Sequence, residues 1–131
     1  HMGLAIVDKR RPKANVSEVM NIIGDVRDKT CILYDDLVDT AGSLCNAAKA
    51  LVEIGGAKEI YACATHGVLS GPAYDRINES CMEEVLFLNT IQPRKDIAEI
   101  CPKIKYLSVA HMFAEAIERI YEERSVSKLF T

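Results

Sequence analysis

Short apolar runs alternate with segments of helical periodicity along most of this 131-residue chain. Apolar residues recur at helical spacing over 44–52 and again over 110–120. Strands that alternate with helix-length segments are typical of βαβ units, so the sequence predicts an α/β fold with a largely parallel sheet flanked by helices. The apolar runs with the length and composition of strands lie at 31–34, 60–64, 85–88 and 104–107.

Small and polar residues mark the ends of the first long helix. Ser43 is the expected N-cap, and the pair Gly55 and Gly56 is the expected stop. A short helix is expected after Pro72. No internal repeat or second-domain boundary is visible, so residues 3–131 are expected to form one domain, preceded by His1 and Met2 as an expression remnant.

Composition excludes several classes of protein. Hydrophobic residues make up 49% and charged residues 27% of the chain, which is ordinary for a globular protein, and no apolar run approaches the roughly 20 residues of a membrane span. A net charge of −3 argues against nucleic acid as the main partner. Five widely spaced cysteines without a CxxC pair predict a reducing, cytoplasmic environment with neither a disulfide framework nor a structural zinc ion.

The stretch "CILYDDLVDTAGSL" (31–44) carries the most chemistry. In open α/β sheets, ligands bind beyond the carboxyl ends of strands, where the N-terminus of a following helix offers unpaired amides and partial positive charge. Ala41 and Gly42 would let the backbone approach a phosphate closely, and Thr40 and Ser43 supply hydroxyl donors. This half of the stretch therefore predicts an anion-binding loop.

Two acids, Asp35 and Asp36, precede that loop at the expected end of the strand. Carboxylates repel a phosphate, but they accept hydrogen bonds from sugar hydroxyls and hold Mg²⁺. An anion-binding loop beside a pair of acids fits a sugar phosphate. The simpler alternative is a polar turn with a helix cap.

Other ligand-binding motifs do not fit the spacing. A P-loop requires GxxxxGK[ST] and a dinucleotide site requires GxGxxG, and neither is present. An EF-hand would need an oxygen ligand at Leu37 and a glycine at Thr40.

The segment "YDDLVDTAGSL" resembles the phosphoribosyl-diphosphate binding motif of type I phosphoribosyltransferases. Three further segments, "LAIVDKRRPKANVSEVMNIIGDV", "ACATHGVLSGPAYDRIN" and "SVSKLF", look like the ribose-phosphate diphosphokinase family. This resemblance runs from about Leu4 to Phe130. It implies a type I phosphoribosyltransferase-like fold, and transfer of the diphosphoryl group of ATP to the 1-hydroxyl of ribose 5-phosphate with Mg²⁺, releasing AMP.

The resemblance also assigns site residues. Asp35 and Asp36 match the acids that contact the ribose hydroxyls, directly or through Mg²⁺. The loop that holds the phosphate of ribose 5-phosphate is matched by Asp39, Thr40, Ala41, Gly42 and Ser43.

Two more segments receive a role from the resemblance alone. Lys9 and Arg11 match a mobile loop that closes over the phosphates of ATP, although a basic run by itself is more often a solvated turn. Ser125, Ser127 and Phe130 match a segment that contributes to a regulatory site, whereas the plain interpretation is a short edge strand. His66 follows a strand and could face the site, but a histidine satisfied by hydrogen bonds is the simpler interpretation.

The chain looks like a C-terminal portion of the family enzyme, truncated on its N-terminal side and inactive by itself. A non-catalytic sugar-phosphate-binding or regulatory paralogue and an ordinary phosphoribosyltransferase remain alternatives. A missing strand and helix would leave a sheet edge and an apolar face uncovered, so a homo-oligomer is expected.

Overall fold

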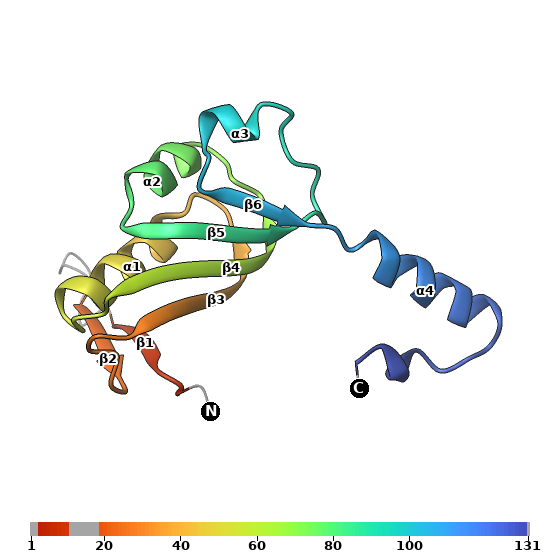
Figure 1. Ribbon diagram of the computed structural model, residues 1–131, viewed down its shortest axis with the longest axis horizontal. Coiled ribbons are helices and arrows are strands. Elements are labelled where there is room, and N and C mark those ends of the chain that lie inside the picture. Colours follow the sequence, from red (N-terminus) through yellow and green to blue (C-terminus); the bar gives the residue numbers. More distant parts are fainter. Residues whose placement is uncertain (1–2, 11–18, 131) are drawn as a thin grey trace.

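The computed structural model describes residues 3–10 and 19–130, and its centre is a four-stranded parallel sheet in the order β3-β4-β5-β6 (Figure 1). This confirms the predicted α/β fold class. All four predicted strands are present, three of them longer than predicted: β3 (Thr30–Val38), β4 (Glu59–Gly67), β5 (Met82–Leu88) and β6 (Ile104–Leu107).

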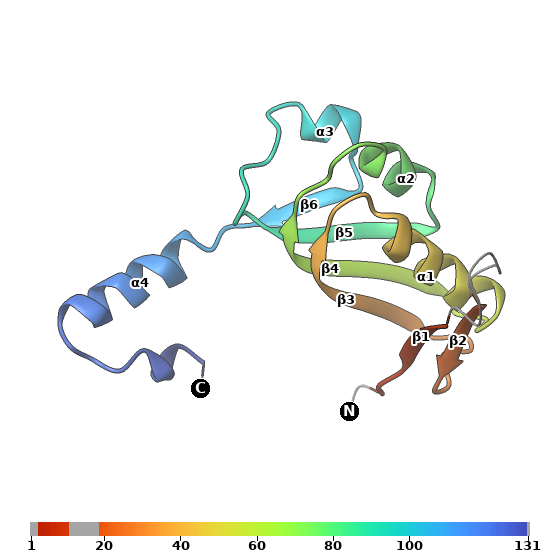
Figure 2. The same ribbon diagram turned by 180° about the vertical axis from the view of Figure 1, so that it is seen from behind.

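One face of the sheet carries the helices α1 (Gly42–Glu53), α2 (Ala73–Glu79) and the short α3 (Ile97–Ile100) (Figure 2). The strands follow one another across the sheet in chain order, and parallel crossovers are right-handed, so every crossover helix lies on the same side. Among the described residues no helix covers the other face. The predicted flanking by helices therefore applies to one face of the sheet.

The hydrophobic core lies between that face and the helices. Phe87, Val85 and Ile60 are fully buried on the sheet, and Ile77 is fully buried on α2. Helix α1 contributes its own apolar side through Leu44, Ala48 and Leu51. The helical periodicity read from the sequence thus marks the side of α1 that packs on the sheet.

Strand β3 continues four residues beyond the predicted end, so Asp35 and Asp36 lie within the strand. The reason is tertiary: β4 is equally long and pairs with β3 in parallel as far as Val38 and Gly67. The backbone ladder is satisfied by the neighbouring strand whatever the side chains are. Polarity alone could not place this boundary.

Helix α1 begins at Gly42, so the predicted N-cap at Ser43 is wrong. The N-cap is Ala41, with φ 60° and ψ 6° and no capping side-chain hydrogen bond. The predicted stop is confirmed, because the helix ends at Glu53 and Gly56 takes a positive φ of 70°.

A second, antiparallel sheet of two strands, β1 (Ile6–Arg10) and β2 (Val19–Ile23), lies beside α1. Ile22 packs against the hydrophobic core. The sequence analysis did not predict this hairpin.

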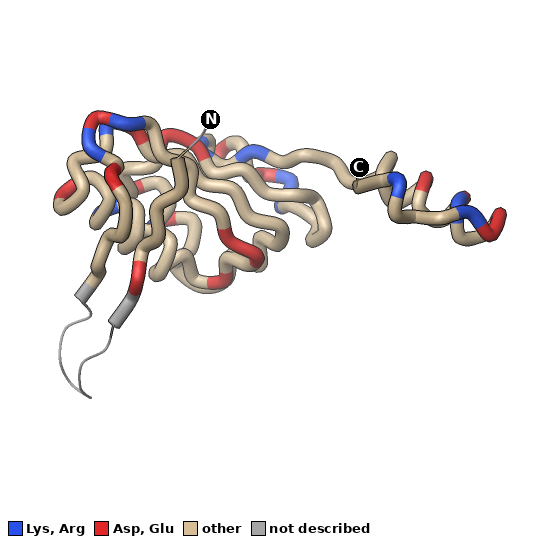
Figure 3. The backbone as a smooth tube through the Cα atoms, turned by 90° about the horizontal axis from the view of Figure 1, so that it is seen from below, with Lys and Arg blue, Asp and Glu red and all other residues tan. Residues whose placement is uncertain are grey.

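The last helix, α4 (Ala110–Tyr121), extends away from the sheet as an arm and is followed by the 3-10 helix η1 (Val126–Leu129). Figure 3 shows the hairpin and the arm leaving the body at opposite ends. The plain interpretation of the tail as an edge strand is wrong, because η1 is helical. No helix among the described residues is long and apolar enough to cross a membrane.

Candidate functional site

The loop from Asp39 to Ala41 joins the carboxyl end of β3 to the start of α1. Ala41 is in the left-handed region and Gly42 begins the helix, and such a change of hand turns successive backbone N–H groups toward one concave side. The 12-residue helix adds the partial positive charge of its N-terminus. A loop with this geometry can receive an anion, the role for which the sequence analysis proposed an anion-binding loop.

A second loop, between β4 and α2, holds the first one in place. The Ser70 amide donates to the Asp39 carbonyl oxygen at 3.0 Å, and the Ser70 hydroxyl donates to Asp39 Oδ1. Arg76, on α2, donates from Nη1 to the Thr40 carbonyl oxygen at 3.0 Å. The two loops therefore form one unit at the carboxyl edge of the sheet.

Gly42 allows the Arg76 guanidinium to approach the start of α1 closely, which the sequence did not show. A Cβ atom at this position would lie 3.2 Å from Arg76 Nη1, closer than side chains normally pack. The second loop also contains a residue in the left-handed region, Leu69 with φ 54°, whose side chain is buried. Backbone conformations of this kind cost about 1–3 kcal/mol each, and they cluster at ligand-binding sites.

Asp35 and Asp36 are not brought together on one side of β3. Successive side chains of a strand point to opposite faces, and here Asp35 is half-buried while Asp36 is exposed. Asp35 Oδ1 accepts the amide of Asp36 at 2.9 Å. The two carboxylates cannot bind one cation in the manner of a chelating pair.

One carboxylate at this edge of the sheet would hold Mg²⁺ only together with oxygen ligands from other groups. Mg²⁺ keeps several waters and is usually held by one or two carboxylates together with oxygens of the substrate. Among the described residues, no group of three His, Cys, Asp or Glu side chains is close enough to hold a metal ion without such help.

His66 lies near the carboxyl end of β4 and is hydrogen-bonded. Its Nδ1 is 2.7 Å from Thr90 Oγ1, and the Thr90 hydroxyl donates to the Thr65 carbonyl oxygen at 3.1 Å. This network fixes the segment after β5 against β4. It supports the interpretation of His66 as a histidine satisfied by hydrogen bonds.

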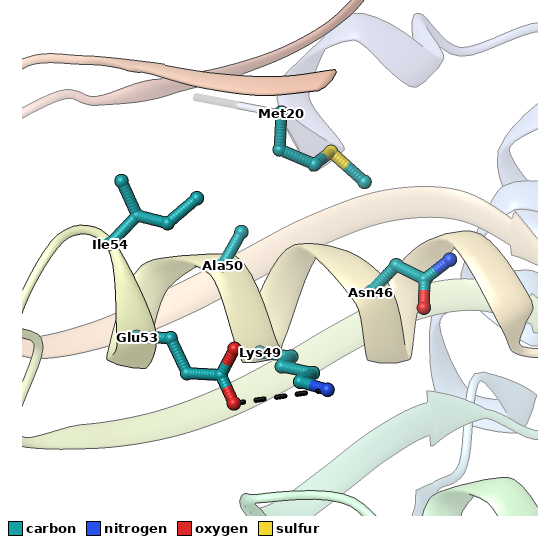
Figure 4. Close-up of a pocket in the computed structure, with 6 residues that line it drawn as sticks. All are labelled: Met20, Asn46, Lys49, Ala50, Glu53 and Ile54. Carbon is teal, nitrogen blue, oxygen red and sulfur yellow. Dashed lines mark ion pairs between the residues drawn. The ribbon is translucent and has the colours of Figure 1, made fainter. Parts of the chain in front are cut away.

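The hairpin lies beside the middle and the C-terminal end of α1. Ile22 Cδ1 lies near Gly55, beyond the end of α1, and Met20 lines a hollow together with residues between Asn46 and Ile54 (Figure 4). Lys9 is the register partner of Met20. The hollow is lined by Met20, Asn46, Lys49, Ala50, Glu53 and Ile54. The backbone of Lys9 thus lies beside β2, and Arg11 lies outside the described residues.

The predicted regulatory residues lie on the arm, away from the loop (Figures 1 and 2). Ser125 Oγ accepts the amide of Ser127 at 3.3 Å and so caps η1, and the Phe130 side chain is 79% exposed. Within one chain the structure does not bring Ser125, Ser127 and Phe130 to the anion-binding loop.

None of the buried thiols has the environment of a nucleophile. Burial raises the pKa of Cys45, on α1, although the nearby Arg76 acts in the opposite direction. Burial likewise raises the pKa of Cys31 and of Cys101. All five cysteines are free.

The sequence analysis missed Ser70 and Arg76. Both lie in the segment "ACATHGVLSGPAYDRIN", which contributed to the family resemblance, but neither side chain received a role. No spacing rule connects Asp39 to Ser70, because they are 31 residues apart and meet only when β3 and β4 pair.

Comparisons with known proteins give one family. Residues 5–131 match the phosphoribosyl synthetase-associated domain. A curated relative from Clostridium tetani, named ribose-phosphate pyrophosphokinase, is 65% identical over 132 residues, which cover 99% of this chain and 40% of the relative. A protein of the same name from Caldanaerobacter subterraneus is 65% identical over 128 residues, covering 98% of this chain and 40% of the relative.

A solved structure shares the fold. The crystal structure of phosphoribosylpyrophosphate synthetase from Mycobacterium smegmatis superposes with a TM-score of 0.74 at 39% sequence identity, covering 80% of this chain and 34% of that one. The present chain spans about 40% of the length of the curated relatives it matches.

Proposed function

The chain belongs to the phosphoribosyl synthetase-associated domain family, and from this premise we propose that it is the ribose 5-phosphate-binding portion of a ribose-phosphate diphosphokinase. Diphosphokinase and pyrophosphokinase are two names for the same activity. The complete enzyme would transfer the diphosphoryl group of ATP to the 1-hydroxyl of ribose 5-phosphate, giving phosphoribosyl diphosphate and AMP for nucleotide biosynthesis. The chain alone is expected to be inactive.

The loop at the start of α1 would bind the 5-phosphate of the sugar. Backbone amides of Thr40, Ala41 and Gly42 and the hydroxyls of Thr40 and Ser43 are the donors. The supporting observation is the left-handed Ala41, which directs amides of the loop to one side at the N-terminus of a 12-residue helix.

The acids of β3 would receive the ribose end of the ligand. One carboxylate, Asp35 or Asp36, would accept hydrogen bonds from ribose hydroxyls or hold Mg²⁺ together with substrate oxygens. Bound Mg²⁺ would neutralise charge on the transferring phosphates. Lys9 and Arg11 are proposed to bind the phosphates of ATP, a role that rests on the family resemblance of the segment that contains them.

Calorimetric titration of this chain with ribose 5-phosphate, with and without Mg²⁺, tests the binding site. Saturable binding is expected, and Asp39→Ala should abolish it. Asp25→Ala removes an exposed carboxylate from the turn before β3 and is the matched control, so it should bind as the unmodified chain does. Absence of binding by the folded, unmodified chain would contradict the proposal that this loop binds the sugar phosphate without the rest of the enzyme.

A coupled assay for AMP separates the remaining alternatives. A diphosphokinase of full length carrying these residues should release AMP from ATP only when ribose 5-phosphate is present. An ordinary phosphoribosyltransferase would instead consume phosphoribosyl diphosphate and release diphosphate. A non-catalytic paralogue would bind ribose 5-phosphate and show neither activity.

We also propose that the chain associates with further copies of itself, in the cytoplasm. The face of the sheet without helices exposes large apolar side chains: Ile32 is 63% and Tyr34 80% exposed. Their register partners on β4, Tyr61 and Cys63, extend the same apolar surface. The arm exposes a second apolar surface through Phe113, Ile117 and Ile120. Exposed apolar surfaces of this size favour association.

Sizing chromatography with light scattering tests the association. A dimer or larger species is expected at micromolar concentration, and Ile117→Asp should shift it toward the monomer. A monodisperse monomer of the unmodified chain would contradict this part of the proposal.

A further inference from the structure

We propose that Ser70 and Arg76 are positioning residues of the anion-binding loop, and that Asp39 acts as their anchor and does not contact the phosphate. This inference rests on the proposed function, because the ligand it concerns is ribose 5-phosphate. The sequence analysis assigned no role to the side chains of Ser70 and Arg76.

The first step concerns the direction of two backbone N–H groups, which follows from the planarity of the peptide bond. In a trans peptide unit the carbonyl oxygen and the following N–H point in opposite directions. The Asp39 carbonyl oxygen accepts the Ser70 amide, so the Thr40 N–H points away from the second loop. The Thr40 carbonyl oxygen accepts Arg76 Nη1, so the Ala41 N–H also points away from it.

Two consecutive amides are thereby turned to the side of the loop that is free for a ligand. Neither the Thr40 nor the Ala41 amide donates to a backbone carbonyl of the described residues. Ligand oxygens are the partners that would satisfy them. Because these donors are held in place before the phosphate binds, less conformational entropy is lost when the loop binds its ligand.

The second step concerns the carboxylate of Asp39. A carboxylate beside a phosphate weakens binding by charge repulsion unless another group holds it away from the ligand. Its Oδ1 accepts the Ser70 hydroxyl, while its carbonyl oxygen accepts the Ser70 amide. One serine therefore holds both the side chain and the backbone of Asp39 against the second loop. The carboxylate is directed away from the side on which the free amides lie.

The third step is the rigidity of the support. Arg76 extends from α2, where Ala73 and Ile77 are fully buried, so its Cα atom cannot shift freely. The Cys45 thiol donates to the Arg76 carbonyl oxygen at 3.5 Å and links α1 to α2 at the same point. Gly42 leaves the space that the guanidinium occupies.

Variants at Arg76 separate positioning from fold. Arg76→Met keeps the length of the side chain and removes the donor, so the affinity for ribose 5-phosphate should fall about tenfold. Arg76→Lys keeps one donor and the charge and should recover most of that loss. Arg27→Met, which removes an exposed arginine from the turn before β3, is the matched control and should bind as the unmodified chain does.

A double-mutant cycle tests the link between Ser70 and Asp39. Ser70→Ala and Asp39→Asn should each weaken binding, and the double variant should be little weaker than the worse single one, because both changes break the same contact. Additive losses would overturn the proposed link. Binding by Arg76→Met equal to that of the unmodified chain would overturn the role of Arg76.

Amide NMR of the ligand-free chain makes the two proposals distinguishable. In Arg76→Met and Ser70→Ala, the Thr40 and Ala41 amide resonances should shift and exchange faster with solvent, while the thermal midpoint stays close to that of the Arg27→Met control. Unchanged resonances would overturn the positioning role even if ribose 5-phosphate binds. Shifted resonances without any binding by the unmodified chain would overturn the proposed function and leave the positioning of the loop supported.

Discussion

Helices α1 and α4 have the same length of 12 residues, and both show apolar residues at helical spacing. Their environments differ completely. Helix α1 buries Leu44, Ala48, Ala50 and Leu51, whereas α4 has no buried residue. The hydrophobic pattern of a helix therefore says that an apolar side exists, but not whether the same chain covers it.

The ends of the two helices differ in the same way. Helix α1 starts at a loop that is hydrogen-bonded to Ser70 and Arg76, and beyond its last residue, Glu53, the Gly56 carbonyl oxygen accepts the Asp28 amide at 2.9 Å. Helix α4 follows Val109, whose amide donates to Asn89 Oδ1 at 2.9 Å, and it is followed by Glu123 with φ 55°. One helix is held by tertiary contacts at both ends, and the other mainly at its start.

The largest expected difference comes from truncating one apolar side chain on each helix. Leu51 is 3% exposed and Ile117 is 67% exposed. Leu51→Ala should lower the free energy of unfolding by about 2–5 kcal/mol, because it leaves a cavity in the core. Ile117→Ala should change it by about 0.5 kcal/mol or less, since the side chain is mostly exposed and its truncation leaves no cavity in the core. Denaturant unfolding of both variants at low protein concentration checks the contrast. A large loss in Ile117→Ala would mean that the arm is packed in solution.

A change at the two N-caps should give the next largest effect. Ala41 is buried in the left-handed region, where a β-branched side chain is strained. Ala41→Val should therefore cost about 1–3 kcal/mol and abolish ribose 5-phosphate binding. Val109 has an ordinary φ of −95°, so Val109→Ala should have a much smaller effect. Thermal unfolding and calorimetric titration measure both; equal losses would contradict the role given to backbone strain.

Substitutions at the residues that follow the two helices should change the stability of the helices in opposite directions. Gly56, with φ 70°, and Glu123, with φ 55°, both lie in the region that favours glycine. Gly56→Ala should destabilise the chain by about 1 kcal/mol, and Glu123→Gly should stabilise α4 by a similar amount. Circular dichroism during thermal unfolding measures both effects. Glu122→Gly is the control, because it adds the same backbone freedom to the unfolded chain at a residue with negative φ. Destabilisation by Glu123→Gly equal to that of the control would refute it.

The smallest expected effect concerns pH. The hydrogen bond from Lys29 lowers the pKa of Asp25 below its usual 3.8, and the Arg27 amide adds to this. Such a group stabilises the fold fully above pH 3.8 and loses its contribution as the pH falls below that value through the lowered pKa. The thermal midpoints of the unmodified chain and Asp25→Asn should differ slightly at neutral pH and converge in acid. A difference that persists at pH 2 would contradict the assignment.

Much of the fold was predictable because strands and helices have characteristic patterns of apolar residues over short stretches of sequence. The runs at 104–107 and 110–120 differ from β6 and α4 by one residue at most. The boundary at Tyr34 was wrong because β4 extends β3 through residues that are polar in sequence. The hairpin of β1 and β2 was not predicted because the segment between its two strands is long and contains no two-residue hairpin motif such as Asn-Gly or Asp-Gly.

The candidate site was predictable only in part. The loop from Asp39 to Ser43 could be recognised because its residue types follow a strand and open a helix, and all of them lie together in the structure. The separate directions of Asp35 and Asp36 follow from strand alternation, once β3 is known to include them. Ser70 and Arg76 could not be found by spacing, because they reach the loop only through the pairing of β3 with β4.

The sequence by itself determined the local elements, the α/β class and the residue types of the anion-binding loop, because propensity, periodicity and turn chemistry act over a few neighbouring residues. The tertiary structure decided where β3 ends, which carbonyl oxygens of the loop are held, and which apolar surfaces stay exposed. Those features depend on residues such as Asp39 and Ser70, 31 positions apart, and contacts at that separation exist only after the sheet has formed.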